Sequence, residues 1–428
     1  MSGRAYRPRR LPAGALMLVL CVSIIVAAVL LSLLFLVSNR RVLVERDTMR
    51  QTVRRNLFSG VAYAQGHAHL PYCHRYGLDL FGEGRDSVTV EKKPWGAFDV
   101  AVVTAANAHF ADTAVALLGS QFTAINQAAL YLAEERIPLS VGDDAQVRGQ
   151  AYVANAESAH PANLPALGAP RTGAPITGAL HASRPQLPIN GDSALARLRD
   201  YAALRLQAWL PAGSRTITGL GSRRVSFFGA AMVIFQPEPA TLQHLALAGQ
   251  IVVVSSRRLT VEASAQLDNV LLLAPVVVVK AGFRGRVQII ARDTVEIQHD
   301  CELAYPSAVC AYAGTTTPAQ VLLGENTRVR GLVVAANATG GGATATAVVR
   351  MAAGAAVEGQ VFSTGTVENC GSVRGSVMCR RLIYRTPTSF YNNYLVNAVL
   401  DRPGLPAAFL TSPLLNAGAP IGVIAWLH

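Results

Sequence analysis

Val329-Arg330-Gly331-Leu332-Val333 is one of several short stretches with the pattern Val-[Arg/Glu]-Gly-x-[Ala/Val]. The pattern recurs at residues 147–151, 357–361 and 373–377, and a degenerate copy spans residues 283–287. Alternating apolar residues supply the inward face of a strand, and glycine allows a tight corner where a larger side chain would clash. We therefore predict a β-solenoid, in which each coil buries its apolar side on the next, with corners at Gly149, Gly285, Gly331, Gly359 and Gly375.

The spacing of these copies is irregular. They start at residues 147, 283, 329, 357 and 373, so the chain is not a strict array. The stretch from residue 250 to 377 is rich in strand signals, with runs such as 251–254 (Ile-Val-Val-Val) and 276–279 (four valines), and poor in helix signals. The predicted fold is therefore mainly β with a partial solenoid (β-helix), and a β-sandwich whose corners look alike is the alternative.

The N-terminal part has a different character, because residues 11–39 carry no charge and follow several arginines. At ~1.5 Å per residue, about 20 residues cross a ~30 Å hydrocarbon core as a helix. The helical spacing continues to residue 63, so we expect a transmembrane helix that extends as a rod. A secretory signal peptide is the alternative, because Ala62-Tyr63-Ala64 resembles a cleavage site.

These signals divide the chain into five segments. Residues 1–64 form a cationic head, the transmembrane helix and its helical extension, and residues 65–154 form a small α+β or β region that leads into the first solenoid corner. Residues 155–192 are rich in proline and are typical of a loop or linker. Residues 193–390 begin with a helix and continue as the solenoid-like domain, and residues 391–428 cap it, since an open solenoid end exposes unpaired strand edges.

The chain is basic, with a net charge of +12. Apart from those that flank the apolar span, the arginines are scattered, and no RNP, helix-turn-helix or zinc-finger pattern occurs. We therefore predict no nucleic-acid partner. The apolar span makes the lipid bilayer the first expected partner.

Two cysteine pairs share a nine-residue spacing, Cys301 with Cys310 and Cys370 with Cys379. In an oxidising compartment, disulfides would close these two short loops. The alternative is that the four cysteines are reduced and buried in the core. A four-cysteine zinc site is disfavoured, because the usual Cys-x2-4-Cys knuckles are absent.

Residue types that ligate metals gather after the rod, where His67, His69, Cys73 and His74 fall within eight residues. An exposed polar loop is the simpler interpretation of this segment, so these four residues are weak candidates. We predict no metal site and no cofactor.

Catalytic signatures are scarce, since the chain has neither a P-loop pattern nor His-Glu-x2-His. Glu296, His299, Asp300 and Glu302 would suit an acidic groove in a polysaccharide-cleaving β-helix, but the outward faces of strands commonly carry such residues. We predict that the protein is not an enzyme and has no catalytic residues.

The N-terminus resembles the minor pilins and pseudopilins of type IV pilus and type II secretion systems. Residues 14–20 (Gly-Ala-Leu-Met-Leu-Val-Leu) open an apolar helix that runs into a polar rod. Most pilins carry a glutamate five residues after the processed glycine, and this chain has Val19 at that position, a departure that the tip-type minor members share. Processing at Gly14 is therefore left open.

Beyond this anchor, residues 95–98 (Trp-Gly-Ala-Phe), 116–119 (Ala-Leu-Leu-Gly), the corner at 147–149 and the tail at 394–427 resemble a group of uncharacterised bacterial envelope proteins. Those proteins combine a pilin-like anchor with a β-rich exterior. The solenoid corners also resemble the polymer-forming bactofilin repeat, a cytoskeletal family without this anchor. Neither resemblance implies a catalytic residue.

We therefore expect a single-pass protein of the cytoplasmic (inner) membrane whose C-terminal domain lies on the periplasmic or external side. Its expected role is structural or in assembly, as a minor-pilin-like subunit of a secretion or pilus-like apparatus, with other envelope or pilin-like proteins as partners. A membrane-anchored, polysaccharide-active β-helix enzyme and a non-catalytic surface-binding protein are the alternatives.

Overall fold

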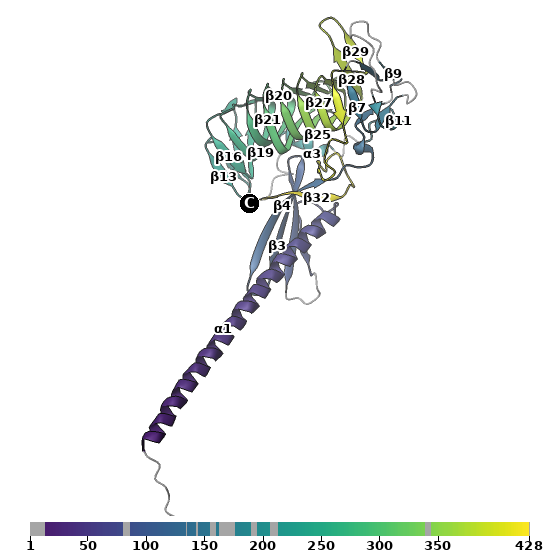
Figure 1. The fold of residues 1–428 in the computed structure, drawn as a ribbon. Coiled ribbons are helices and arrows are strands. Elements are labelled where there is room, and N and C mark those ends of the chain that lie inside the picture. The colour runs from purple at the N-terminus through teal and green to yellow at the C-terminus, as the bar shows by residue number, and fades with distance from the viewer. Residues whose placement is uncertain are drawn as a thin grey trace, which may run out of the picture.

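A computed structural model of the chain shows one long helix joined to a β-rich head (Figure 1). The structure describes residues 13–79, 86–133, 135–142, 144–154, 160–161, 176–189, 195–205, 213–338 and 344–427. The predicted cationic head before residue 13 and most of the predicted proline-rich segment 155–192 lie outside the described residues.

Helix α1 (Ala13–Gly66) is an uninterrupted rod of 54 residues. No proline falls within it, so no backbone hydrogen bond is lost along its length. Its apolar first part is exposed on all sides, whereas Val53, Leu57, Val61 and Ala64 recur at helical spacing and are buried against the head. The predicted apolar helix that continues as a rod is therefore confirmed.

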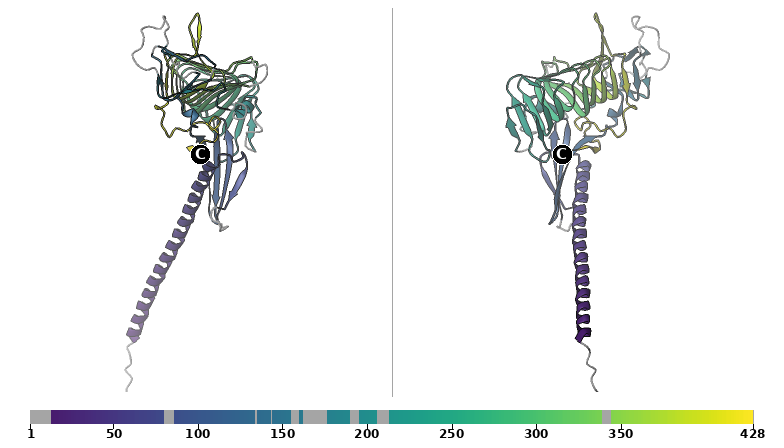
Figure 2. Two further views of the ribbon diagram at one scale, coloured as in Figure 1. Left: turned by 90° about the vertical axis from the view of Figure 1, so that its right-hand side faces the viewer. Right: turned by 60° about the vertical axis from the view of Figure 1, so that its left-hand side comes forward.

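The last turns of α1 pack on a five-stranded antiparallel sheet with the order β1-β2-β3-β4-β32. Its strands are β1 (Arg75–Leu78), β2 (Ser87–Trp95), β3 (Phe98–Ala106), β4 (Ala111–Ser120) and β32 (Ile421–Leu427). Alternate side chains serve opposite faces, so Val88 and Val103 pack with α1 while Phe98 and Leu117 pack with the rest of the head. The sheet is a layer between the rod and the coils described next (Figure 2).

The rest of the head is a stack of parallel coils with three faces. The first face consists of β13 (Arg223–Val225), β16 (Ala246–Gly249), the first residues of β19 (Gln266–Val279), β20 (Arg284–Ile297), β21 (Glu302–Ala313), β23 (Arg328–Asn337), β25 (Ala356–Ser363) and β27 (Ser372–Cys379), then β31 (Val399–Asp401), β7 (Gln146–Arg148) and β10 (Ile176–Thr177).

The second face bends away from the first and is covered by the antiparallel sheet. It consists of β12 (Arg215–Ile217), β14 (Met232–Gln236), β17 (Ile251–Ser255), the continuations of the same six long strands, β5 (Leu130–Leu132), β8 (Ala151–Val153) and β11 (Leu180–Ala182). The third face consists of β15 (Ala240–Leu242), β18 (Arg258–Val261), the ends of β19 and β20, β22 (Gln320–Leu323), β24 (Val348–Met351), β26 (Thr366–Asn369) and the start of β28 (Arg381–Arg385).

Short elements flank the stack. They are η1 (Ile125–Gln127), helix α3 (Ala196–Ala202), β29 (Phe390–Asn392), which is antiparallel to β28, and a small parallel sheet of β30 (Tyr394–Val396), β6 (Ser140–Gly142) and β9 (His160–Pro161). Helix α3 lies against β19, β20 and β21 on the second face.

The repeated valines form the core of the stack. Val329, Val357 and Val373 are direct partners in successive coils, and none of them is more than 1% exposed. Each coil therefore buries its inward side on the next. Consecutive coils pair in parallel, which is the geometry of stacked coils rather than of an antiparallel sandwich. The predicted fold class, mainly β beyond one long apolar helix, is confirmed.

One coil is assembled from two distant parts of the chain. After β27, the first face continues with β31 (Val373 opposite Leu400) and the second face continues with β5 (Met378 opposite Tyr131). β31 then pairs with β7, and β5 pairs with β8. The repeat copy at 147–151 therefore lies beside the C-terminal copies in space, which explains its large separation from them in sequence.

Candidate functional site

Rod, sheet and coils meet where the β2–β3 hairpin touches the second face of the stack. The hairpin turns at Gly96, which has a φ of +58°. Gln288 on β20 accepts a hydrogen bond from the Ala97 backbone N–H at 2.7 Å and donates one to the Trp95 carbonyl at 3.1 Å. One buried glutamine thus fixes the tip of the hairpin to one coil.

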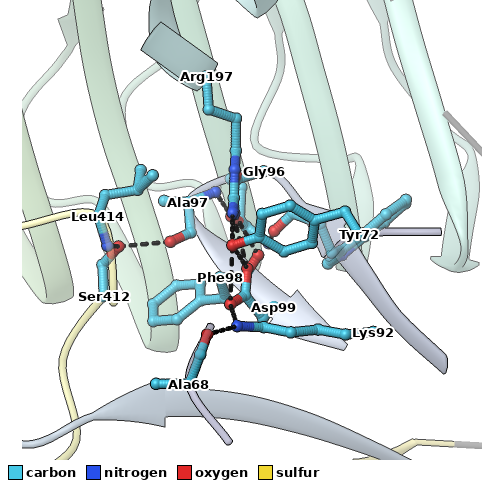
Figure 3. Close-up of polar contacts among 12 residues, drawn as sticks. Ala68, Tyr72, Lys92, Gly96, Ala97, Phe98, Asp99, Arg197, Ser412 and Leu414 are labelled. Atoms are coloured by element: carbon cyan, nitrogen blue, oxygen red, sulfur yellow. Dashed lines mark hydrogen bonds and ion pairs between the residues drawn. The ribbon is translucent and has the colours of Figure 1, made fainter. Parts of the chain in front are cut away.

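A cluster of buried charges lies beside this tip (Figure 3). The Asp99 carboxylate is 3.0 Å from Lys92 Nζ and 2.8 Å from the Arg197 guanidinium, and the Tyr72 hydroxyl lies 3.2 Å from each of its oxygens. Asp99 is fully buried, and Lys92 and Arg197 are 2% and 5% exposed. We call Tyr72, Lys92, Asp99 and Arg197 the junction cluster.

The four residues come from three separate elements. Lys92 and Asp99 come from the two strands of the β2–β3 hairpin, Arg197 comes from α3, and Tyr72 follows the end of α1. The same side chains bind backbone, since Lys92 donates to the Ala68 carbonyl at 2.8 Å and Arg197 donates to the Phe98 carbonyl at 2.9 Å. The junction cluster therefore ties the end of the rod to the sheet and to the helix that covers the coils.

The junction cluster contains two cations and one carboxylate, so it carries a net positive charge. Burial raises the pKa of Tyr72 to about 12, which keeps its hydroxyl protonated as a donor to Asp99. Burial by itself would lower the pKa of Arg197, but the neighbouring Asp99 raises it overall, so the guanidinium stays charged. Because removing one partner from a buried ion pair costs several kcal/mol, such a cluster favours one arrangement of its segments over others. Asp99, which both cations contact, has no exposed surface.

A second buried network attaches the segment that precedes β32. Gln360 on β25 accepts hydrogen bonds from Asn416 at 2.9 Å and from Thr411 at 3.2 Å, and Asn416 in turn accepts one from Asn126 at 2.7 Å. Ser412 donates to the carbonyl of Ala97 at the hairpin tip (Figure 3). Neutral hydrogen bonds thus join the C-terminal segment to the coil and to the hairpin, in addition to the ion pairs of the junction cluster.

The second functional feature is the apolar part of α1. Among the described residues, α1 is the one helix that is long and apolar enough to cross a membrane, with a mean hydropathy of 3.1 over its most apolar window and none of that window buried in the head. A single anchor of this kind fits lipid contact, because nothing else in the described chain covers these side chains.

The four candidate metal ligands do not come together. Among the described residues, no group of three His, Cys, Asp or Glu side chains is placed to hold an ion. His67 instead stacks on Tyr63 with 3.9 Å between the ring centroids. His69, Cys73 and His74 lie in the exposed or half-exposed segment between α1 and β1.

The predicted disulfides are wrong for this fold, because all four cysteines are free thiols. The 12-residue strand β21 runs between Cys301 and Cys310, and β27 runs between Cys370 and Cys379. An extended strand advances ~3.3 Å per residue, whereas the Cα atoms of a disulfide lie within ~7 Å of each other. Burial raises the pKa values of Cys310 and Cys379, as expected for the reduced, buried alternative.

The predicted corner glycines line the bend between the first and second faces. Gly331, Gly359 and Gly375 are direct partners in consecutive coils, with φ values of +140°, +141° and +143°. A Cβ on Gly359 or Gly375 would overlap the carbonyl oxygen of the preceding corner glycine. Gly149 also has a positive φ, of +117°. Gly331, Gly359 and Gly375 are bends within strands, whereas Gly149 lies between β7 and β8.

Gly285 lies before this bend, opposite Leu303 and at the level of Val329, and it has no positive φ. A Cβ there would lie 2.7 Å from the Phe283 ring and 2.9 Å from the Leu267 carbonyl oxygen, so close packing rather than backbone conformation requires glycine. The clash of a larger side chain, which the sequence analysis gave as the reason for glycine at the corners, therefore applies to Gly285, although this residue lies outside the bend.

The carboxylates that suggested an acidic groove have local partners. Asp300 is bonded to His299 at 2.9 Å and to Asn326 at 3.3 Å, and these hydrogen bonds lower the pKa of Asp300. Glu296 accepts a hydrogen bond from Gln298 at 3.3 Å. The structure does not pair Glu296 with Asp300.

Comparison with known proteins adds little to this geometry. No known protein family matches the sequence, and no curated protein does. A solved structure of the competence-associated pilin ComZ from Thermus thermophilus is similar at 10% identity, covering 89% of this chain and 96% of that chain with a TM-score of 0.23. A likeness at that TM-score carries no argument about fold or function.

Proposed function

We propose that the protein is a single-pass anchor and spacer of the cytoplasmic membrane, which holds a rigid β-rich head outside the membrane as a structural or assembly component. The observation that carries this proposal is the continuity of α1. The same helix presents a fully exposed apolar surface at one end and is buried in the head at the other.

The dimensions of the rod suit this role. Residues 14–38 span ~37 Å as a helix, enough to cross a ~30 Å hydrocarbon core. Residues 39–48 are exposed and add ~15 Å before the helix reaches the sheet. The junction cluster and the Gln360 network then fix the head to the rod, so the head keeps one orientation with respect to the membrane.

The finer part of the proposal is a minor-pilin-like subunit of a secretion or pilus-like apparatus. Its support is the N-terminal resemblance together with an apolar helix that runs on as a rod. Within this proposal the head is non-enzymatic, uses no cofactor, and contacts other envelope or pilin-like proteins.

Thiol labelling tests the topology, because the chain supplies a natural probe. Cys73 is exposed in the head, whereas Cys21 lies in the apolar span, Cys370 is half-buried, and Cys301, Cys310 and Cys379 are buried. A membrane-impermeant maleimide, added to cells with a permeabilised outer layer, is expected to label the protein through Cys73. Because burial raises the pKa of Cys73, the reaction is run at mildly alkaline pH.

The matched control is Cys73→Ser in a Cys370→Ser background, which should abolish the labelling that Cys370→Ser alone retains. Labelling of Cys73 only after the cytoplasmic membrane is lysed would place the head in the cytoplasm and overturn the proposed orientation.

A further inference from the structure

The first face of the stack carries a row of arginines that the proposed function does not use. Arg330, Glu358, Arg374, Asp401 and Arg148 are direct partners in five successive coils. Neighbouring strands lie ~4.8 Å apart, so the guanidinium groups recur at every second coil, at intervals of ~10 Å. We call these five residues the arginine row.

The cations of the arginine row face solvent more than its carboxylates do. The side chains of Arg330, Arg374 and Arg148 are 43%, 61% and 52% exposed, against 33% for Glu358 and 19% for Asp401. Glu358 is shared, since it lies 3.1 Å from Arg330 and 3.3 Å from Arg374. The outermost layer of the row is therefore positive.

A depression of about 410 Å³ opens on this face and is lined by Arg328, Arg330, Glu358, Ser372 and Arg374, among others. Arg328 is exposed, and in the described part of the chain no carboxylate lies within ion-pair distance of it. The depression thus holds three guanidinium groups for one carboxylate. None of its lining residues is aromatic.

We propose that this depression and the arginine row bind a linear polysaccharide that carries carboxylates. The planar guanidinium fork matches a carboxylate with two parallel hydrogen bonds. A chain with one carboxylate on every second sugar presents its charges at an interval close to that of every second coil.

Nucleic acid fits this surface less well. Its phosphates follow one another every ~3.4 Å along a DNA duplex strand, far more densely than the arginines of the row. Single strands bind largely by stacking their bases on aromatic side chains, and the lining has none. The inference does not depend on which side of the membrane the head occupies.

Calorimetry on the full chain in lipid nanodiscs tests the proposal, with hyaluronate oligosaccharides as the probe because they carry one carboxylate per disaccharide. We expect saturable binding that weakens as salt is added. The double variant Arg330→Gln/Arg374→Gln should bind at least about tenfold more weakly. The matched control is Arg292→Gln, which removes an exposed arginine that is also paired with a carboxylate, Asp293, away from the depression.

Arg328→Gln is the variant that keeps the test independent of folding, because it breaks no ion pair and should still weaken binding. Neutral dextran should not bind. The proposal is overturned if hyaluronate does not bind, if Arg292→Gln weakens binding as much as the double variant, or if a single-stranded thymidine oligonucleotide binds more tightly than hyaluronate.

Discussion

The coil stack and the junction solve the same problem, holding strands in register, by opposite means. In the stack, Val329, Val357 and Val373 repeat one inward contact from coil to coil, and the glycine bends repeat one backbone conformation. At the junction, a single Asp99 and a single Gln288 fix segments that are far apart in sequence. The stack is therefore specified by a periodic local pattern, whereas the junction is specified by contacts that occur once.

The largest expected effect is on the periodic region, at Gly359. Gly359→Val forces a β-branched residue to a positive φ and drives its Cβ into the Gly331 carbonyl oxygen. Strain and overlap together should lower the free energy of unfolding by about 4 kcal/mol. Denaturant titration of the detergent-solubilised chain measures this loss, and Arg292→Ala is the exposed control, expected to cost under about 0.5 kcal/mol. Unchanged stability in Gly359→Val would show that the glycine bends are not required.

At the junction, the loss of stability should depend on whether a negative or a positive charge is removed. Asp99→Asn leaves Lys92 and Arg197 buried without a carboxylate and should cost about 3–4 kcal/mol. Lys92→Met removes one of the two cations and leaves Asp99 paired with Arg197. This variant should therefore lose clearly less stability than Asp99→Asn. The same denaturant titration separates the two variants, and equal losses would mean that packing rather than charge holds the junction together.

Alkaline pH should destabilise the region around the junction cluster through Tyr201, which lies on α3 with Arg197. Burial raises the pKa of Tyr201 to about 12, from an ordinary value near 10, and Tyr201 is 1% exposed. Because the folded state favours the protonated phenol, its contribution is complete below pH ~10 and is lost as the pH rises towards ~12, by roughly 2 kcal/mol. Tyr201→Phe should flatten this part of the stability-against-pH curve. An identical slope in the variant would assign the alkaline loss to other groups.

The smallest effects are expected on the solvent side of the coils. Glu296→Ala changes a half-exposed side chain and should cost under about 0.5 kcal/mol, and Asp300→Ala changes an exposed side chain and should leave the stability unchanged. Thermal unfolding curves that overlay the wild type are the expected result. A folded variant that loses a polysaccharide-cleaving activity present in the wild type would reinstate the enzymatic alternative.

The stack has a repeated sequence pattern and the junction has none, and this difference decides how much of each region could be predicted from the sequence. The valines and glycines of the repeat can be recognised in the sequence, because each copy needs an inward-facing valine and a glycine at the bend. Two further bends were missed, at Gly249 with φ +89° and at Asn269 with φ +58°, because their flanking residues depart from the repeat and because asparagine also adopts this conformation. A looser pattern, with any aliphatic residue at the first and fifth positions, any residue at the second, and Gly or Asn at the third, matches both 247–251 and 267–271.

The junction cluster had no comparable signal. Asp99 and Arg197 are separated by almost a hundred positions, and neither lies in a repeated pattern, so nothing local marks them as partners. The equal cysteine spacing also failed to predict the structure, because the four cysteines form no disulfide. The equal spacing is not a structural repeat, because Cys310 lies in register with Met378 rather than with Cys379, and an extended strand separates the two cysteines of each pair.

The coil built from β5 and β31 also constrains how the chain reaches its final form during synthesis. Residues 130–153 leave the ribosome early, yet their neighbour on the first face, β31, is made some 250 residues later. Until β27 and β31 have been made, the edges of β5 and β7 that pair with them remain uncovered, a state prone to aggregation that chaperones commonly shield. Closure of the head is therefore a late step after translation of β31, and residues 372–401 decide when β5 and β7 become protected.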